Sequence, residues 1–195
     1  MNKDQARTVM AALDTGAYEH QEDGSILLTR NNLSVKGTYV SSVNGGDVQE
    51  HANIWTNEGL IYLLSAGLYN GTKLPTWYLA LYSGNYTPVA TITAASFPAT
   101  ASEITSVTEG YTETTRRTWT PAAPSANTID NYASPGTFTI ATASSITVYG
   151  AALLSDQTKG AVTGTLASIT RFATPRVLYN TDSFQLGYRC QLQVA

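Results

Sequence analysis

The spacing of apolar residues along the chain predicts a protein built mainly from β-strands. In residues 183–193 every second side chain is apolar, so one face of an extended strand would be buried by Phe184, Leu186, Tyr188, Cys190 and Leu192. Further strands are expected where β-branched and aromatic residues stand between turn signals, at 77–83, 114–120, 137–141, 145–154, 165–172 and 176–179. Many short strands separated by Gly, Pro and Asn turns are typical of an antiparallel β-sandwich, here jelly-roll-like.

Two apolar runs near the N-terminus, residues 25–30 and 33–43, are separated by Asn31 and Asn32. Asparagine tolerates the positive φ of a tight turn, so the two runs are expected to pair as a β-hairpin. A second turn signal, at residues 44–47, ends the second strand of this hairpin.

One helix is predicted near residues 56–67. Thr56 is a suitable N-cap, Glu58 lies near the positive end of the helix dipole, and Gly67 is a natural C-terminal stop. Leucines recur at helical spacing in this stretch, which predicts one buried stripe formed by Leu60, Leu63, Leu64 and Leu68.

Residues 1–17 are predicted to form an N-terminal arm in front of a single β-sandwich domain, residues 18–195. An apolar face at helical spacing is shared by Ala6, Val9, Met10 and Leu13. Because the stretch is too short to be a stable helix alone, it is either a frayed terminus or a segment that lies on a surface. Its own domain or a neighbouring chain would supply that surface.

The segment 87–100 is a long run of small residues with two prolines, which predicts an exposed loop suited to contacts. Together with the arm, this region supplies the predicted partner-contact residues, which are Val9, Met10, Leu13, Tyr86 and Phe97.

Composition and charge exclude several classes of protein. The chain is 43% hydrophobic, which is unlike a disordered protein, and its formal net charge of −3 disfavours nucleic-acid binding through bulk charge. Cys190 is the single cysteine, so a disulfide framework is excluded. The apolar run Leu60–Leu64 is far shorter than the roughly 20 residues of a membrane span, and the N-terminus lacks the apolar segment of a signal peptide. We therefore expect a soluble chain made in the cytoplasm, with no membrane or nucleic-acid partner.

Few residues offer metal or nucleophile chemistry. The two histidines, His20 and His51, would form a metal site only together with Asp47 or Glu50, and both are expected to be solvated loop residues. Cys190 faces inward on its strand and is expected to behave as a small buried hydrophobe. No metal or cofactor is predicted.

Three carboxylates raise the alternative of a glycosidase, which uses a carboxylate pair. Glu103, Glu109 and Glu113 would share one face of an extended strand, but their Thr-rich surroundings favour solvated side chains, so no enzyme activity is predicted. Arg116 and Arg117 would point to opposite faces of a strand, one of them anchoring a salt bridge.

Aromatic residues are compatible with a sugar-binding platform or with a core. The chain contains 12 tyrosines and three tryptophans, Trp55, Trp77 and Trp119, of which Trp77 is expected in the core. Exposed tyrosines on β-sheets are also common at protein interfaces, since a rigid ring gives contact area at low entropic cost.

Several phrases follow one another in residues 50–195, in the order WTNEGLIYLL, WYLALYSGNYTP, RRTWTP, FTIATASSITVYGAALLS, GTLASITRF and TDSFQLGYRCQLQV. This order resembles small virion structural proteins of tailed bacteriophages, of the capsid decoration (cement) or head–tail-associated kind. The resemblance implies a β-sandwich that holds the major capsid protein or other virion proteins on the outer head surface and performs no chemistry. A homo-oligomer is expected. A neck, collar or tail-fibre component, or a host-glycan-binding module, are the alternatives.

Overall fold

The computed structural model describes residues 19–20, 26–27 and 33–194. The chain divides into two compact units, of which the larger spans Val35–Gln191 and the smaller comprises Met1–Ser34 with Leu192–Ala195. In the smaller unit β1 (Glu19–His20) pairs with β2 (Ile26–Leu27) and with no strand of either large sheet. The predicted end of the arm, residue 17, lies outside the described residues and stays a prediction.

The larger unit is a mainly β protein with two antiparallel sheets, as predicted for a β-sandwich. The first sheet has the order β4-β3-β13-β10-β7, with β9 on β13, and consists of β3 (Leu33–Val43), β4 (Gly46–Ala52), β7 (Gly110–Tyr111), β9 (Thr128–Asp130), β10 (Gly136–Ala141) and β13 (Ser183–Val194). The second has the order β5-β12-β11-β6-β8 and consists of β5 (Ile54–Trp55), β6 (Trp77–Tyr82), β8 (Arg117–Trp119), β11 (Ser145–Leu154) and β12 (Leu166–Tyr179).

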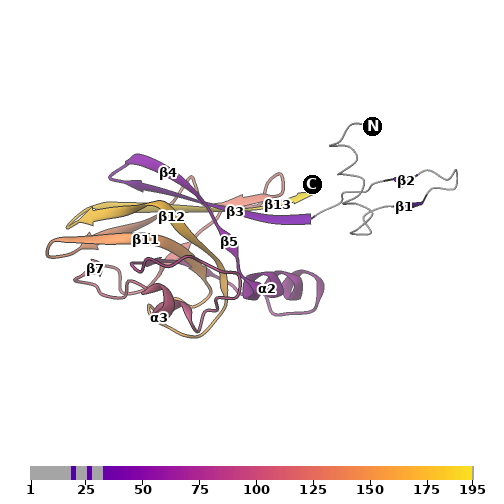
Figure 1. The fold of residues 1–195 in the computed structure, drawn as a ribbon, viewed down its shortest axis with the longest axis horizontal. Helices are drawn as coiled ribbons and strands as arrows, with labels where there is room; N and C mark the ends of the chain where they lie inside the picture. The colour runs from indigo at the N-terminus through magenta and orange to yellow at the C-terminus, as the bar shows by residue number, and fades with distance from the viewer. Residues whose placement is uncertain (1–18, 21–25, 28–32, 195) are drawn as a thin grey trace. The chain divides into compact units, whose positions relative to one another are not determined.

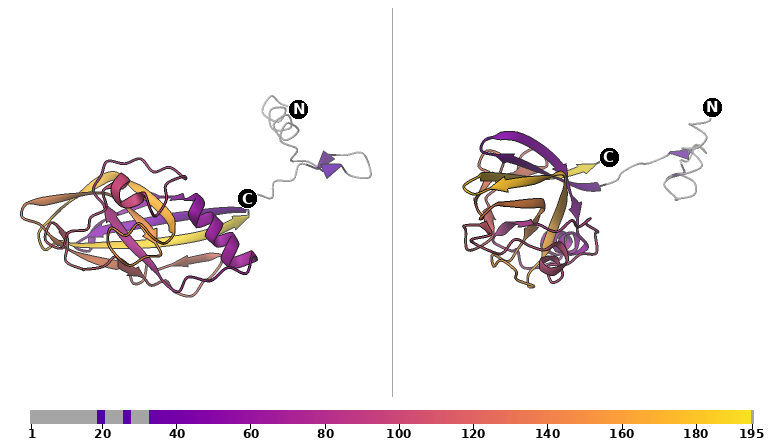
Figure 2. Two further views of the ribbon diagram at one scale, coloured as in Figure 1. Left: turned by 90° about the horizontal axis from the view of Figure 1, so that it is seen from below. Right: turned by 60° about the vertical axis from the view of Figure 1, so that its left-hand side comes forward.

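Two described helices accompany the sheets, α2 (Asn57–Leu68) and α3 (Phe97–Ala101). In Figure 1 the strands β3, β4 and β13 lie above β11, and α2 lies at one end of the sandwich. The left-hand view of Figure 2 shows α2 at the same end, and the helix contacts β12 of the second sheet.

The second sheet is buried on both faces, which explains the unbroken apolar run of β6. Successive side chains of a strand point to opposite faces. Leu79 and Leu81 enter the core between the sheets, whereas Ala80 and Tyr82 enter a second apolar cluster on the outer face. The segment 87–103 covers this outer cluster and contributes Ile92 and Phe97 to it. The segment 87–100 is irregular up to α3 and half of its residues are exposed, as predicted, but Pro88, Ile92, Ala94 and Phe97 are buried and its last residues form α3.

The predicted N-terminal hairpin is wrong in its pairing. Residues 33–43 form β3 as expected, but β3 pairs with the following strand β4 across Asn44 and Gly45, which both have positive φ. The predicted turn at Asn31 and Asn32 lies outside the described residues. The strands predicted at 165–172 and 176–179 are one strand, β12, whose pairing with β11 jumps from Gly150–Arg171 to Val148–Arg176. The irregularity includes Pro175, which has no N–H to donate to a ladder.

Candidate functional site

Helix α2 is attached to the second sheet through its first turn. Thr56 caps the helix, since its hydroxyl accepts from the N–H of Gly59 at 3.0 Å and donates to Leu166 O. The Glu58 carboxylate accepts from the N–H groups of Ala94 and Leu166, at 2.9 and 3.0 Å. The sequence therefore fixes the start of the helix as predicted, by an N-cap and an acidic first turn.

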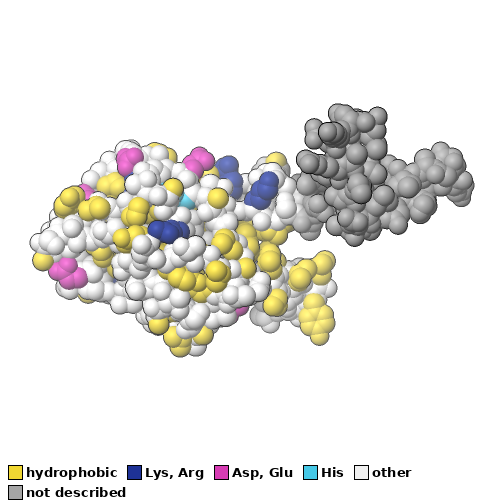
Figure 3. Space-filling model, in the orientation of Figure 1, with side chains coloured by type: hydrophobic (Ala, Val, Ile, Leu, Met, Phe, Trp, Pro, Cys, Tyr) yellow, Lys and Arg dark blue, Asp and Glu magenta, His cyan; other side chains and the backbone are white. Residues whose placement is uncertain are grey.

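The outer face of α2 is apolar and exposed. The exposed fractions are 37% for Leu60, 67% for Ile61, 60% for Leu64 and 87% for Leu68, and the adjoining Tyr69 is 79% exposed. Figure 3 shows hydrophobic side chains gathered over this end of the sandwich. We call these five residues the α2 surface.

The predicted buried stripe of Leu60, Leu63, Leu64 and Leu68 is therefore wrong, except at half-buried Leu63. The physical reason is the close approach of the helix to β12 at Gly59, the one fully buried residue of α2. A Cβ atom on Gly59 would lie closer than 3 Å to backbone atoms of Ala167. Contact through glycine orients the helix so that most leucines face outward.

A cavity of about 170 Å³ lies beneath the helix, between the two sheets. Its lining is almost wholly apolar and comes from α2 and both sheets: Trp55, Tyr62, Leu63, Trp77, Trp119, Ile129, Leu153, Ala167, Tyr188 and Cys190. Tyr62 and Trp77 meet edge to face, with ring centroids 5.1 Å apart. Burial raises the pKa of the Cys190 thiol to about 11, so this side chain is protonated and apolar at neutral pH.

The size and chemistry of the cavity restrict what it can hold. Pockets for drug-sized ligands are roughly 300–1,000 Å³, whereas a cavity of roughly 150 Å³ accommodates benzene. The indole Nε1 of Trp55 is buried and has no hydrogen-bond partner. The α2 surface is the outer face of the helix, whereas Tyr62 and Leu63 line the cavity from its inner face. The two are therefore separate apolar features, and the exposed α2 surface is the one that a partner can reach.

The predicted partner-contact residues differ in their burial, and three of the five lie outside the described residues. Phe97 is completely buried and packs against Tyr82 with ring centroids 6.1 Å apart, so its prediction as a contact is wrong. Tyr86 is half-buried against the outer apolar cluster. The other three, Val9, Met10 and Leu13, lie outside the described residues and stay predictions.

The three carboxylates are engaged by the protein itself. Glu103 was expected in solvent, but its side chain is fully buried and forms two hydrogen bonds of 2.7 Å to the Arg116 guanidinium. Glu109 accepts from the Thr142 hydroxyl at 2.7 Å, and Glu113 lies 3.9 Å from the partly exposed Arg117. The arginine pair thus behaves as predicted, with one member anchoring a salt bridge inside the protein.

His51 is a buried strand residue and not the solvated loop residue that we predicted. Its ring stacks on Phe172, with centroids 4.2 Å apart, and its Nε2 lies 3.1 Å from Ser41 Oγ. Burial, and secondarily the charge of Arg176, lowers its pKa to about 4. The Asp47 carboxylate pairs with Arg176 and not with a metal site. Among the described residues no three His, Cys, Asp or Glu side chains are grouped to hold a metal ion.

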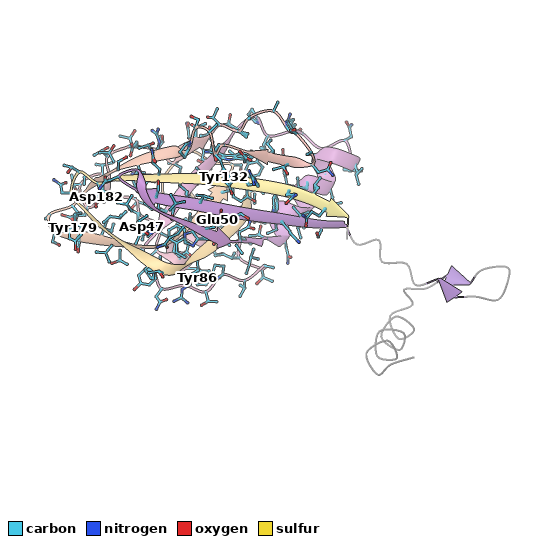
Figure 4. All side chains as sticks on the ribbon, turned by 90° about the horizontal axis from the view of Figure 1, so that it is seen from above. Asp47, Glu50, Tyr86, Tyr132, Tyr179 and Asp182 are labelled. Atoms are coloured by element: carbon cyan, nitrogen blue, oxygen red, sulfur yellow. The ribbon has the colours of Figure 1, made fainter. Side chains whose placement is uncertain are left out.

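The tryptophans do not form an exposed platform. Trp119 is buried and donates from Nε1 to Asn131 Oδ1 at 3.2 Å, while Trp55 and Trp77 pack partly buried against the core, as predicted for Trp77. Tyr179 is exposed beside Asp182, whose carboxylate accepts from the Tyr179 N–H at 2.8 Å, at the end of the sandwich away from α2 (Figure 4). It therefore lies far from the tyrosine of the α2 surface.

No protein-family model matches the chain, and no curated protein matches its sequence. Among the described residues, no helix is long and apolar enough to cross a membrane.

The signal for the α2 surface was present in the sequence, in the five consecutive apolar residues Leu60–Leu64. A run of this length surrounds the helix, so it cannot face one side only. The cavity had no local signal, because its lining comes from residues between Trp55 and Cys190 that only the fold brings together.

Proposed function

We propose that this chain is a virion structural protein of a tailed bacteriophage, which acts by binding neighbouring virion proteins. The observation that carries the proposal is the exposed α2 surface above an apolar cavity. Leu68 and Ile61 leave 87% and 67% of their accessible surface in water, and contiguous apolar patches on a folded protein mark contact sites. The β-sandwich and the resemblance of residues 50–195 to phage virion proteins support the same role.

Within the virion, the first assignment is a capsid decoration or cement protein on the outer head surface, made in the host cytoplasm. Its partners would be the major capsid protein or other virion proteins, with neither a nucleic acid nor a membrane involved. The net charge of −3 suits a surface that faces away from packaged DNA. A neck, collar or tail-fibre component is the second assignment, and a host-glycan-binding module is the third.

The copy number in purified phage particles tests the proposal, measured by quantitative mass spectrometry against the major capsid protein. A ratio near one, or near a simple fraction of one, supports decoration of the shell. A ratio of only about a few copies per hundred supports the neck or tail assignment, since those structures occur once per particle. Absence of the chain from particles refutes a virion role.

A further inference from the structure

The α2 surface is exposed and apolar, and the chain itself carries a segment of fitting chemistry. Apolar residues at i, i+3, i+4 and i+7 are the anchors by which an amphipathic helix binds an apolar groove. The N-terminal segment has this spacing in Ala6, Val9, Met10 and Leu13. Such a short segment needs a surface in order to become helical, and α2 offers one.

The path of the chain brings this segment to the correct end of the sandwich. Gly37, the fifth residue of β3, lies near Tyr188, since Asn53 N–H donates to Gly37 O and Asn53 Nδ2 donates to Tyr188 Oη, each at 3.3 Å. Tyr188 lines the cavity. The sequence that precedes β3 therefore joins the larger unit at the end that carries α2.

The length of that preceding sequence sets its reach. Residues 14–34 separate Leu13 from Val35, the first residue of the larger unit. Because Glu19 lies opposite Leu27 in the β1–β2 pair, the span comes from residues 14–18 and 28–34, and it is at most about 40 Å at full extension. This reach extends to the α2 surface of an adjacent copy in a closely packed assembly.

We infer that the partner of the α2 surface is a second copy of this chain, whose residues 6–13 lie along α2. Exposed Ile61 and Leu64 would contact the apolar face of that segment. The inference rests on the proposed function, because a shell of adjacent copies supplies the neighbour. Arm-to-helix contacts repeated around a particle would turn weak single contacts into firm attachment.

Light scattering of the purified full chain tests the inference with two complementary variants. One variant carries Val9→Asp, Met10→Asp and Leu13→Asp, and the other carries Ile61→Glu and Leu64→Glu. We expect the wild type to exceed the 20.8 kDa monomer mass and each variant alone to be a monomer. An equimolar mixture of the two should regain dimers, since one variant keeps a working arm and the other a working α2 surface.

The matched control is Val177→Glu, which changes an exposed valine (53%) on β12, near Tyr179 and away from α2. It should keep the wild-type mass. A fluorescently labelled peptide of residues 1–17, added to the arm variant, should gain anisotropy as it binds the α2 surface, whereas a scrambled peptide should not. Urea unfolding of both variants checks that the sandwich is intact.

A monomeric wild type, or an arm variant that keeps the wild-type mass, overturns the inference. Attachment of the same variants to phage particles tests the proposed function separately. If the α2 variant no longer attaches to particles while the arm variant attaches normally, the α2 surface is a virion contact but its partner is a different protein. If the α2 variant attaches as the wild type does, the α2 surface is not the attachment site.

Discussion

The buried ion pair between Glu103 and Arg116 gives the sharpest test of the energetics of the fold. Both side chains are fully buried and joined by two hydrogen bonds of 2.7 Å. Arg116 also donates to Asp156 O at 2.9 Å, and Glu103 accepts from Gly160 N–H at 3.0 Å, so the pair fastens the segment around residue 103 to the loop 155–161.

Replacing one partner leaves the other as an uncompensated buried charge. Arg116→Met removes the guanidinium and leaves the Glu103 carboxylate with the single N–H of Gly160. We expect a loss of about 3–5 kcal/mol in the free energy of unfolding, a large share of the roughly 5–15 kcal/mol that stabilises a typical domain. Glu103→Leu should destabilise the protein by a similar amount, because it leaves the buried Arg116 guanidinium without a carboxylate.

The double variant Glu103→Leu/Arg116→Met removes both charges and should be no less stable than either single variant. Its coupling energy should then be at least about 3 kcal/mol, well beyond the additivity of independent sites. The Asp156 carbonyl loses its hydrogen bond from Arg116 in both Arg116→Met and the double variant. The cost of that loss therefore cancels from the coupling energy. Urea unfolding at pH 7, followed by tryptophan fluorescence, provides the four free energies. Additive losses, or a loss below 1 kcal/mol for Arg116→Met, would refute the reasoning.

Three further predictions concern His51, α2 and the cavity. The pKa of His51 is about 4 in the folded chain and near 6.5 in the unfolded chain, so between these pH values the unfolded chain binds more protons. The free energy of unfolding should therefore fall by up to about 3 kcal/mol on acidification. Urea unfolding at pH 7 and 4.5 should show a smaller fall for His51→Gln than for the wild type, and equal falls would contradict this. Gly59→Ala should destabilise by about 1–3 kcal/mol through its clash with Ala167, whereas Gly67→Ala, which meets open space, should be neutral or stabilising in thermal unfolding. Cys190, with its raised pKa, should react with iodoacetamide at pH 8 at least about tenfold more slowly when folded than in urea; equal rates would show that the thiol is accessible.

The sheets could be predicted from the sequence because burial imposes a period on strands. In β13 the alternation placed Phe184, Leu186 and Tyr188 on the inward face, and all three are completely buried. β6 was also located correctly, but its unbroken apolar run did not reveal that a second layer, residues 87–103, covers its outer face. A small-residue segment with prolines has the composition of a loop whether water or a sheet lies beside it.

The candidate site was harder to predict because it depends on contacts between distant residues. Glu103 and Arg116 are each polar within Thr-rich stretches, and only their mutual approach makes burial favourable. The helix could be located from its cap, yet its orientation depends on the contact of Gly59 with Ala167, more than a hundred residues away. Helical spacing identifies the residues that share a face, but not which face meets the sheet.

Attachment of the purified chain to phage particles that lack it measures whether the α2 surface holds the protein on the virion. Wild type, Ile61→Glu/Leu64→Glu and the control Val177→Glu would be added at equal concentration, and bound protein would be quantified after sedimentation of the particles. The account predicts that wild type and control bind alike and that the α2 variant loses at least about nine-tenths of its binding, while its urea midpoint stays at the wild-type value. Binding of the folded α2 variant at the wild-type level would contradict the assignment of the α2 surface as the contact site.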